Sequence, residues 1–277
     1  MYKVIIIGSG NKGALADAPG TGNENKYLSY GHAVQDHAGY ELLGFSDIDK
    51  IKAINAASIW GGEDFCIPQE YCEDCEDRFY HKADVIIVAN PDDMHYETLS
   101  IIADYYPKLV ICEKPLCTSL EQAVGIVGLY QSRGIPLLLD YTRRFIPYWQ
   151  RARADVNKAG EFLKGYCYFN RGVAHTLSHF IDLALWFKGN LDGIHIEEVE
   201  ASYQWVFQWG LFYEKDFFSE HAVNFVKNPQ VDSIYDKHLW YVMDNAYNFL
   251  EGKEALICTA EDGLKALQEC IRLEGLR

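Results

Sequence analysis

Three closely spaced glycines near the start of the chain have the spacing of a phosphate-binding turn. The segment GSGNKG, residues 8–13, directly follows the apolar residues 4–7. In such a turn the first glycine allows a tight bend, the second lets the backbone approach a diphosphate, and the third lets helix and strand pack closely. A glycine-rich turn without function is the alternative. We expect a diphosphate to be held by Gly8, Gly10, Asn11, Lys12 and Gly13.

An acidic residue follows the second apolar run. Asp47 can accept hydrogen bonds from the ribose hydroxyls of an adenosine and would repel a 2′-phosphate, which favours NAD over NADP. Its neighbour Ile48 joins the expected cofactor contacts. Such an acid usually lies about 20 residues beyond the turn; here residues 14–30, rich in Gly, Asn, Asp and Pro, indicate an inserted loop. A helix-capping role for Asp47 is the alternative, and the two roles are compatible.

Alternating apolar runs and helix-like stretches place these residues in a doubly wound α/β fold. Continuous apolar strands are typical of a parallel sheet covered on both faces. The runs occupy residues 4–7, 42–45, 85–89, 109–112 and 136–139. The helix-like stretches occupy residues 32–37, 48–57, 95–105 and 119–132. The sequence predicts a Rossmann dinucleotide-binding domain over residues 1–140.

Residues 141–277 have a different pattern, which predicts a shortened α+β domain with a mainly antiparallel sheet. Residues 162–170 and 198–208 alternate as half-buried strands do. Helices are expected over residues 147–158, 175–187, 239–250 and 260–272. One strand carries an aromatic series that favours a face buried against a partner or helix over a sugar-stacking platform: Tyr203, Trp205, Phe207 and Trp209.

The composition and charge of the chain predict which classes of partner it avoids and which cellular compartment it occupies. The chain has 277 residues, is 49% hydrophobic and has a formal charge of −15. Such a charge repels phosphate backbones and anionic membranes, so we expect no nucleic acid and no membrane partner. No apolar run reaches the roughly 20 residues of a bilayer span. Eight cysteines without a visible export signal indicate reduced thiols and predict a cytoplasmic protein.

Further motifs follow the later apolar runs. They are ANPDDMH at residues 89–95, EKP at 113–115, YTRRFIP at 141–147 and LSHFIDL at 177–183, with AEDGL at 260–264 in the last helix. With the glycine turn, this ordered set resembles the Gfo/Idh/MocA family of NAD(P)-dependent sugar and cyclitol oxidoreductases. The resemblance covers nearly the whole chain.

The resemblance implies a site between a Rossmann domain and a second domain, residues 141–277, whose sheet often makes dimers. We therefore expect a homo-oligomer, a dimer or tetramer, with NAD and a sugar-like substrate. Asn90 and Pro91 would flank the nicotinamide, and Lys114 would contact substrate and cofactor. A cis peptide is implied before Pro115. The motifs also place among the cofactor contacts Ala89, His95 and Glu113.

On the family pattern, Lys114 and His179 carry the chemistry. Oxidation of a secondary alcohol removes a hydride from carbon and a proton from oxygen. A lysine in a closed cleft supplies positive charge, and a histidine titrates near neutrality. A surface lysine and a histidine bonded to backbone are the alternatives. Many members have an aspartate three or four residues before the histidine, where this chain has His175 and Thr176. His175 is thus a candidate second proton carrier, and water is the alternative.

Tyr141 and Arg144 complete the expected substrate contacts, although Arg144 equally suits a lock at the domain junction. His175 and His179 have the i,i+4 spacing of metal ligands, with Asp182 nearby. No further ligand is evident and the family needs no metal, so we expect none. Asp182 better suits a structural hydrogen-bond acceptor.

A cysteine cluster is a second candidate metal site. Cys66, Cys72, Cys75 and His81 have the spacing C-x5-C-x2-C-x5-H. Zinc and incidental thiols on a surface helix both remain open, with the single CxxC pair and its acidic neighbours favouring the latter.

The lead hypothesis is an NAD-dependent dehydrogenase or reductase acting on the CH–OH group of a sugar, sugar derivative or cyclitol. The second is an NAD-binding sensor or partner subunit with weak or no turnover. The missing aspartate and the short second half support that reading. A methyltransferase would share the glycine turn and the acid, but would give no reason for the EKP motif or the helical ending.

Overall fold

The structure, a computed structural model, describes residues 1–66, 79–159, 164–167, 177–191, 209–212 and 235–274. The chain divides into two compact units. The first comprises residues 1–145 and 236–264, and the second comprises residues 146–235 and 265–277. Within the described ranges, no helix combines the length and the apolar character needed to span a bilayer.

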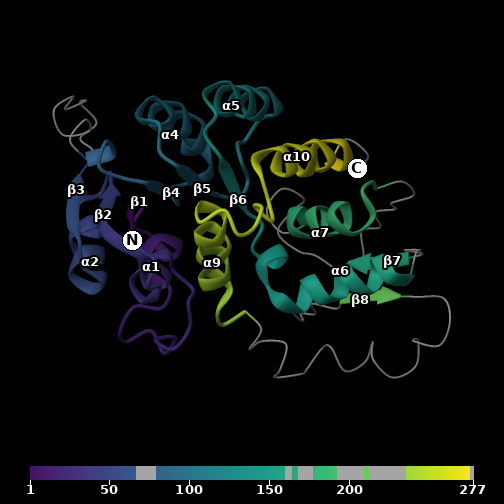
Figure 1. Cartoon of the computed structure of the whole chain (residues 1–277), viewed down its shortest axis with the longest axis horizontal. Coiled ribbons are helices and arrows are strands. Elements are labelled where there is room, and N and C mark those ends of the chain that lie inside the picture. The colour runs from purple at the N-terminus through teal and green to yellow at the C-terminus, as the bar shows by residue number, and fades with distance from the viewer. Residues whose placement is uncertain (67–78, 160–163, 168–176, 192–208, 213–234, 275–277) are drawn as a thin grey trace. The chain divides into compact units, whose positions relative to one another are not determined.

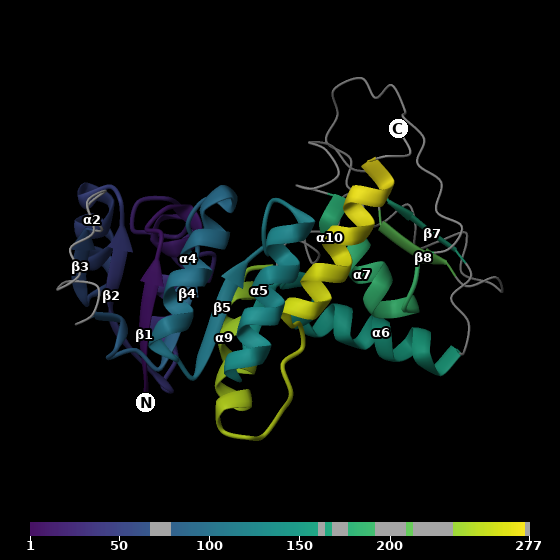
Figure 2. The same ribbon diagram turned by 90° about the horizontal axis from the view of Figure 1, so that it is seen from above.

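The first unit is built on a six-stranded sheet with the order β3-β2-β1-β4-β5-β6, in which every pairing is parallel (Figures 1 and 2). The direction of winding reverses between β1 and β4, as in dinucleotide-binding sheets. The strands are β1 (Tyr2–Ile7), β2 (Tyr40–Asp47), β3 (Glu63–Cys66), β4 (Val85–Val88), β5 (Leu109–Glu113) and β6 (Leu137–Asp140).

Helices cover both faces of this sheet, which explains why its central strands are mostly apolar. Figure 1 shows α4 (His95–Ile102) and α5 (Leu120–Arg133) on one side, and α1 (Tyr30–Asp36), α2 (Lys50–Trp60) and α9 (His238–Leu250) on the other. All residues of β4 and β5 are buried. Short helical turns join the strands and helices: η1 (Asn11–Leu15), η2 (Asp92–Met94), η3 (Ala103–Tyr105) and η4 (Thr142–Phe145).

The predicted parallel sheet is confirmed, with one strand more than the apolar runs indicated. Each of the five runs coincides with a strand, although residues 89 and 136 lie just outside β4 and β6. The sixth strand, β3, has the sequence EDFC and pairs only with β2 at the edge of the sheet. An edge strand needs no continuous apolar run, because one of its sides is not buried by another strand.

The sequence predicted a domain boundary between residues 140 and 141, but the first unit also includes residues 236–264 and with them α9. Two backbone hydrogen bonds tie the start of α9 to the inserted loop, Tyr27 N to Asp236 O at 2.6 Å and Leu239 N to Tyr27 O at 3.3 Å. The Tyr40 hydroxyl donates to the Met243 carbonyl at 2.9 Å. The helix itself was expected, over residues 239–250.

The second unit contains α6 (Pro147–Ala159), α7 (Ser178–Lys188) and the strands β7 (Lys164–Cys167) and β8 (Trp209–Phe212), with α10 (Ala260–Glu274) ending in it. Helices α6 and α7 pack together, and Arg153 Nε donates to the Trp186 carbonyl at 2.9 Å. Strands β7 and β8 pair antiparallel. The larger antiparallel sheet, including Tyr203, Trp205 and Phe207, falls outside the described residues and stays a prediction.

The predicted insertion interrupts the helix that follows the glycine turn. Helix η1 is a single wide turn, with Leu15 N bonded to Gly10 O at 3.1 Å and Ala16 N to Asn11 O at 3.0 Å. The chain leaves the helix there and restarts it at Tyr30. Ser29 caps the new helix by accepting a hydrogen bond from the His32 amide. Residues 16–29 are thus a loop between two helical segments.

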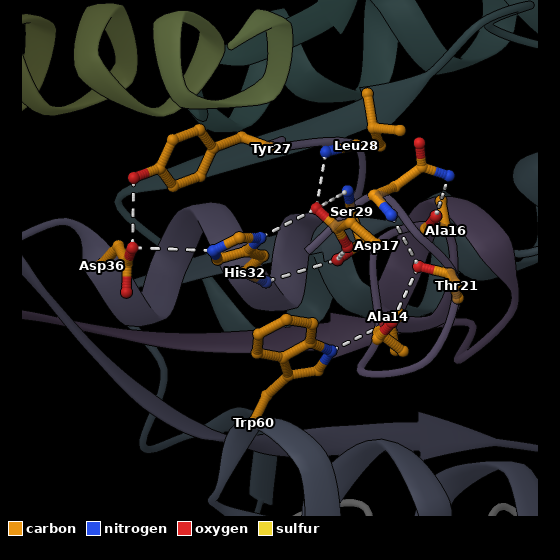
Figure 3. A network of polar contacts seen from close by, with 12 residues as sticks. Ala14, Ala16, Asp17, Thr21, Tyr27, Leu28, Ser29, His32, Asp36 and Trp60 are labelled. Carbon is orange, nitrogen blue, oxygen red and sulfur yellow. Dashed lines mark hydrogen bonds and ion pairs between the residues drawn. The ribbon is translucent and has the colours of Figure 1, made fainter. Parts of the chain in front are cut away.

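The carboxylate of Asp17 holds this loop together (Figure 3). It is fully buried and accepts from the Leu28 amide at 2.6 Å, the Ser29 amide at 3.2 Å and the Ser29 hydroxyl. His32 Nδ1 lies 2.9 Å from the same carboxylate. The His32 ring stacks on Trp60, with centroids 4.8 Å apart. A buried charge needs such partners, since each unsatisfied polar group costs free energy.

Asp17→Asn should therefore lower the free energy of unfolding by about 2–4 kcal/mol. The side-chain NH2 group of the asparagine would face the Leu28 and Ser29 amides, which are also donors. Urea unfolding followed by circular dichroism measures the change. Asp36→Asn is the matched control, since the Asp36 side chain is 48% exposed and lies 3.6 Å from His32 Nε2. It should cost less than about 1 kcal/mol. Equal stability of the Asp17 variant and the natural chain would contradict this account.

Candidate functional site

The glycine turn lies at the carboxyl end of β1, where it packs closely against the end of β4. Gly8 has a φ of +93°, and a Cβ on it would lie 2.5 Å from Asn90 N. A Cβ on Gly13 would clash with the Gly8 carbonyl oxygen. Around Gly10, in contrast, no described atom lies within 4 Å of an added Cβ. Two of the glycines thus allow close packing, and the third leaves the backbone open to a ligand.

Asp47 lies beside this turn. Its Oδ2 accepts a hydrogen bond from Ser9 N at 2.7 Å, and its Oδ1 accepts from Asp49 N at 2.9 Å. The residue that caps α2 is Asp49, whose side chain accepts from the Ile51 amide. The helix cap, which was the alternative role for Asp47, is therefore Asp49. Ile48 is 69% exposed at the same edge.

His95 joins the ends of β4 and β5. The ring is fully buried, with Nδ1 2.7 Å from the Pro115 carbonyl and Nε2 3.1 Å from the Asn90 carbonyl. Burial lowers the pKa of His95, against the opposing effect of the Pro115 carbonyl. The Asn90 side chain donates to Thr98 at 2.8 Å. These contacts indicate that His95 positions both loops.

Lys114 follows the last residue of β5, and the peptide bond between Lys114 and Pro115 is cis, as the resemblance implied. The lysine is therefore placed at the carboxyl edge of the sheet, where ligands bind in open α/β folds. Ala89 and Pro91 flank Asn90 at the same edge, after β4. The structure thus brings together, within one unit, all of the residues predicted to contact the cofactor.

A buried polar cluster adjoins Lys114. Glu113 pairs in register with Asp140 on the neighbouring strand, and both are the last residues of their strands. The Tyr30 hydroxyl donates to Asp140 Oδ2 at 2.7 Å. Lys12 Nζ lies 3.4 Å from Glu113 Oε1 and 3.3 Å from His238 Nε2. Lys12 of the glycine turn is therefore an ion-pair partner of the EKP motif.

This environment shifts the pKa values of Glu113, Lys12 and Tyr30. Burial and the negative charge of Asp140 raise the pKa of Glu113 to about 7, although Lys12 opposes the shift. Burial lowers the pKa of Lys12, but attraction to the carboxylates of Glu113 and Asp140 outweighs it, and the net shift is upward. Burial, Asp140 and Glu113 raise the pKa of Tyr30 well above 10.0.

The sequence reasoning missed Asp140, Tyr30 and His238. Asp140 had a usable signal, because it directly follows an apolar strand, as Asp47 does. Tyr30 and His238 are the first residues of α1 and α9, and no sequence spacing relates them to Lys12 or Asp140. Their positions follow from the packing of α1 and α9.

Tyr141 and Arg144 are nearly fully buried, at 2% and 3% exposed. The Arg144 guanidinium lies 3.1 Å from Asp262 Oδ2 and donates to the Ile257 carbonyl at 3.4 Å. These contacts fasten η4 to the start of α10 inside the first unit. They favour a packing role for Arg144 over contact with substrate.

His179 lies on α7 of the second unit, together with the buried Asp182. His175 falls outside the described residues, as do Cys72 and Cys75 of the cysteine cluster. Among the residues that the structure describes, no three potential metal ligands come together. Both candidate metal sites, the one at His175 and His179 and the cysteine cluster, therefore lie partly outside the described residues.

The Gfo/Idh/MocA model, described as an oxidoreductase family with an NAD-binding Rossmann fold, matches residues 2–141. Inositol 2-dehydrogenase 2 of Saccharopolyspora erythraea is 28% identical over 167 residues, 55% of this chain and 47% of that protein. Glucose-6-phosphate 3-dehydrogenase of Bacillus subtilis is 26% identical over 246 residues, 86% of this chain and 61% of that protein. The chain thus spans 47% to 61% of the length of these curated relatives.

Solved structures share the fold over nearly the whole chain. UDP-N-acetylglucosamine 3-dehydrogenase GnnA from Acidithiobacillus ferrooxidans superposes with a TM-score of 0.68 at 15% identity, covering 98% of this chain and 96% of that one. The WlbA dehydrogenase from Bordetella pertussis, in complex with NADH and UDP-GlcNAcA, gives 0.69 at 16% identity, covering 98% and 94%. At these identities the likeness shows the fold alone.

The raised pKa of Glu113 predicts how stability depends on pH. The folded state keeps the proton up to about pH 7, whereas the unfolded chain loses it near 4.5. Between these values the folded state binds more protons, so stability falls as pH rises, by up to about 1.4 kcal/mol per pH unit. Lys12, with its pKa raised above 10.5, stays charged throughout this window.

Glu113→Gln should flatten this decline, because glutamine does not titrate. Urea unfolding at a series of pH values across the window measures the slope. Glu41→Gln, at an exposed glutamate on β2, serves as the control and should keep the slope of the natural chain. An unchanged slope in the Glu113 variant would show that another group causes the decline.

Proposed function

Because the chain belongs to the Gfo/Idh/MocA oxidoreductase family, we propose that it is an NAD-dependent dehydrogenase or reductase. It transfers a hydride between the nicotinamide and a secondary alcohol or ketone of a sugar, sugar derivative or cyclitol. The sugar or cyclitol class is supported by the names of the relatives, an inositol 2-dehydrogenase and a glucose-6-phosphate 3-dehydrogenase.

The observation that carries the proposal is the open backbone at Gly10 beside a fixed acid. The packing of Gly8 and Gly13 holds the turn in place, and no described atom lies within 4 Å of an added Cβ at Gly10, where the diphosphate would lie. Asp47, oriented by the Ser9 amide, would accept the ribose hydroxyls. These residues fit a dinucleotide, which when bound supplies the hydride acceptor or donor. The carboxylate of Asp47 would repel a 2′-phosphate, so we propose NAD rather than NADP.

The chain's own residues would position the substrate and move the proton. Asn90 and Pro91 would border the nicotinamide, held by the hydrogen bonds of His95. Lys114 would stabilise the developing alkoxide with its positive charge. His179, with His175 as a second carrier, would take part in proton transfer. These roles for Lys114, His175 and His179 come from the resemblance and are part of the proposal.

We further propose a cytoplasmic homo-oligomer, with the second unit as the subunit contact. The described free cysteines, Cys112, Cys117, Cys258 and Cys270, are buried thiols. Reduced thiols are typical of a reducing compartment.

An NAD-binding protein without turnover is the second candidate function. It is favoured by the residues before His179, where His175 and Thr176 stand in place of the aspartate of many relatives. Nicotinamide absorbance, followed with a panel of sugars, sugar phosphates and cyclitols, separates the two candidates. Calorimetry with NAD and NADP tests cofactor choice. The absence of binding to either dinucleotide would defeat both.

Gly10→Ala should weaken NAD binding at least about tenfold, because the added Cβ occupies the space needed by the diphosphate. Stability should change by less than about 1 kcal/mol, since Gly10 has an ordinary φ of −74° and its Cβ meets no described atom. Calorimetric titration measures the affinity. Gly128→Ala, in the open on α5, should bind NAD as the natural chain does. Unaltered affinity in the Gly10 variant would place the cofactor elsewhere.

Lys114→Ala should keep NAD binding within about tenfold and lose most of the hydride transfer, about a hundredfold or more in kcat. The reason is that the lysine acts on the reacting oxygen, whereas the glycine turn and Asp47 hold the cofactor. Rates from nicotinamide absorbance, with affinity from calorimetry, separate the two effects. A full rate in this variant would remove Lys114 from the site.

A further inference from the structure

Two buried carboxyl groups lie side by side at the carboxyl edge of the sheet. Glu113 and Asp140 are register partners on the parallel strands β5 and β6, so their side chains project on the same face. Glu113 is 8% exposed and Asp140 is 0% exposed. Two carboxylates that share a buried site cannot both ionise easily, so one of them holds a proton near neutrality.

The contacts of Asp140 indicate which group carries the proton. Tyr30 donates to Oδ2 at 2.7 Å and Thr142 donates to Oδ1 at 2.9 Å. Both oxygens of Asp140 therefore act as acceptors, as in an ionised carboxylate. The hydrogen bond between the two carboxyl groups helps to raise the pKa of Glu113, after burial and the charge of Asp140. The proton is thus placed on Glu113 and is hydrogen-bonded to Asp140.

Charged groups from several elements face this pair. Lys12 Nζ of η1 lies 3.4 Å from Glu113 Oε1, and the Lys12 side chain is 42% exposed. His238 of α9 contacts Lys12, and Arg143 of η4 acts on Lys12 through its charge. Lys114, next in the chain, also lowers the pKa of Glu113. The half-exposed Lys12 gives the buried pair a polar connection to solvent.

We propose that Glu113 and Asp140 share one proton and form the internal proton store of the hydride-transfer reaction, exchanging that proton with the substrate hydroxyl through Lys114. This inference rests on the proposed function. Many members of the family have an aspartate before the histidine, where this chain has His175 and Thr176. The carboxyl pair would supply the carboxylate that takes part in proton transfer in its place.

The step balances in atoms and charge. In oxidation, the C–H bond of the alcohol carbon breaks and the hydride goes to the oxidised nicotinamide. The O–H bond breaks as well; Lys114 takes that proton as it gives one of its own to the Glu113 carboxylate. Oxidation starts from the form of the pair in which both groups are ionised, which a pKa of about 7 at Glu113 keeps populated at neutral pH, and it ends with one carboxylate and one carboxylic acid. Reduction runs through the same steps in reverse. A pKa of about 7 at Glu113 suits such exchange, because an effective acid–base group titrates near the working pH.

The titration of the pair is measured without any substrate. Protein labelled with carbon-13 in the glutamate side-chain carboxyl groups is titrated by NMR, and Glu113→Gln identifies the signal. We expect a midpoint near 7, lowered by about one pH unit or more in Asp140→Asn and raised in Lys12→Met. Asp104→Asn, at an exposed carboxylate paired with Arg133, should leave it unchanged. A Glu113 signal that titrates in the ordinary range of glutamate would overturn the proposal.

The pH dependence of turnover then tests the link to the reaction. The acidic limb of kcat/KM for oxidation, which reports groups of the free enzyme, should have the same midpoint as the NMR signal, and Asp140→Asn should shift both together. A signal that shifts while the rate profile stays in place would make the pair structural only and overturn the proton store. If the natural chain binds NAD but oxidises none of the panel, the proposed function itself fails, although the NMR midpoint would still be near 7.

Discussion

The close approach of β1 and β4 at Gly8 is the constraint on which the candidate site depends. Gly8 N donates to Ser46 O at 2.7 Å, and Ala89 N donates to Ile7 O at 2.8 Å. The ends of three strands are thus bound together around one residue. A Cβ at Gly8 would lie 2.6 Å from the Ala89 carbonyl oxygen, so only glycine permits this spacing. The same contact places Asp47, from β2, and Asn90, after β4, on either side of the turn. The site is therefore a consequence of backbone packing, to which the side chains add specificity.

The inserted loop shows how a helix can be interrupted without loss of this constraint. A helix that ends after one turn leaves carbonyl groups unsatisfied, and a loop that follows must order its own backbone at an entropic cost. The Asp17 carboxylate compensates by binding the amides of Leu28 and Ser29, and Ser29 in turn caps α1. Trp60 of α2 donates to the Ala14 carbonyl at 2.7 Å, which satisfies one of the exposed groups of η1. The glycine turn and η1 thus stay in place, and the insertion is confined to residues 16–29, between η1 and α1.

The sequence predicted what local patterns determine. Buried parallel strands must be apolar throughout, so five of the six strands of this sheet were found, and β3, with EDFC at the edge, was not. The glycine turn and Asp47 were predicted because the turn needs a particular backbone and the acid follows a strand. Contacts between distant elements left no such pattern. Tyr30 meets Asp140 across 110 residues, and Lys12 meets His238 across 226. The place of α9 in the first unit could not be predicted for the same reason, because an amphipathic helix indicates that it packs, but not against which neighbour.

The charge of the cluster explains how an acidic protein can present an edge suited to an anion. The formal charge of the whole chain is −15, and Asp47, Glu113 and Asp140 contribute negative charge at the carboxyl edge of the sheet, where the dinucleotide is proposed to bind. Lys12 and Lys114 offset two of these charges. A proton on Glu113 offsets the third, so the protonated edge carries no net charge from these five side chains. Binding of an anion at the glycine turn and retention of the proton on Glu113 must then favour each other, because coupling between two sites is reciprocal. Lys12 is the physical connection through which that coupling would act, since it belongs to the turn and its Nζ lies 3.4 Å from Glu113 Oε1 of the pair.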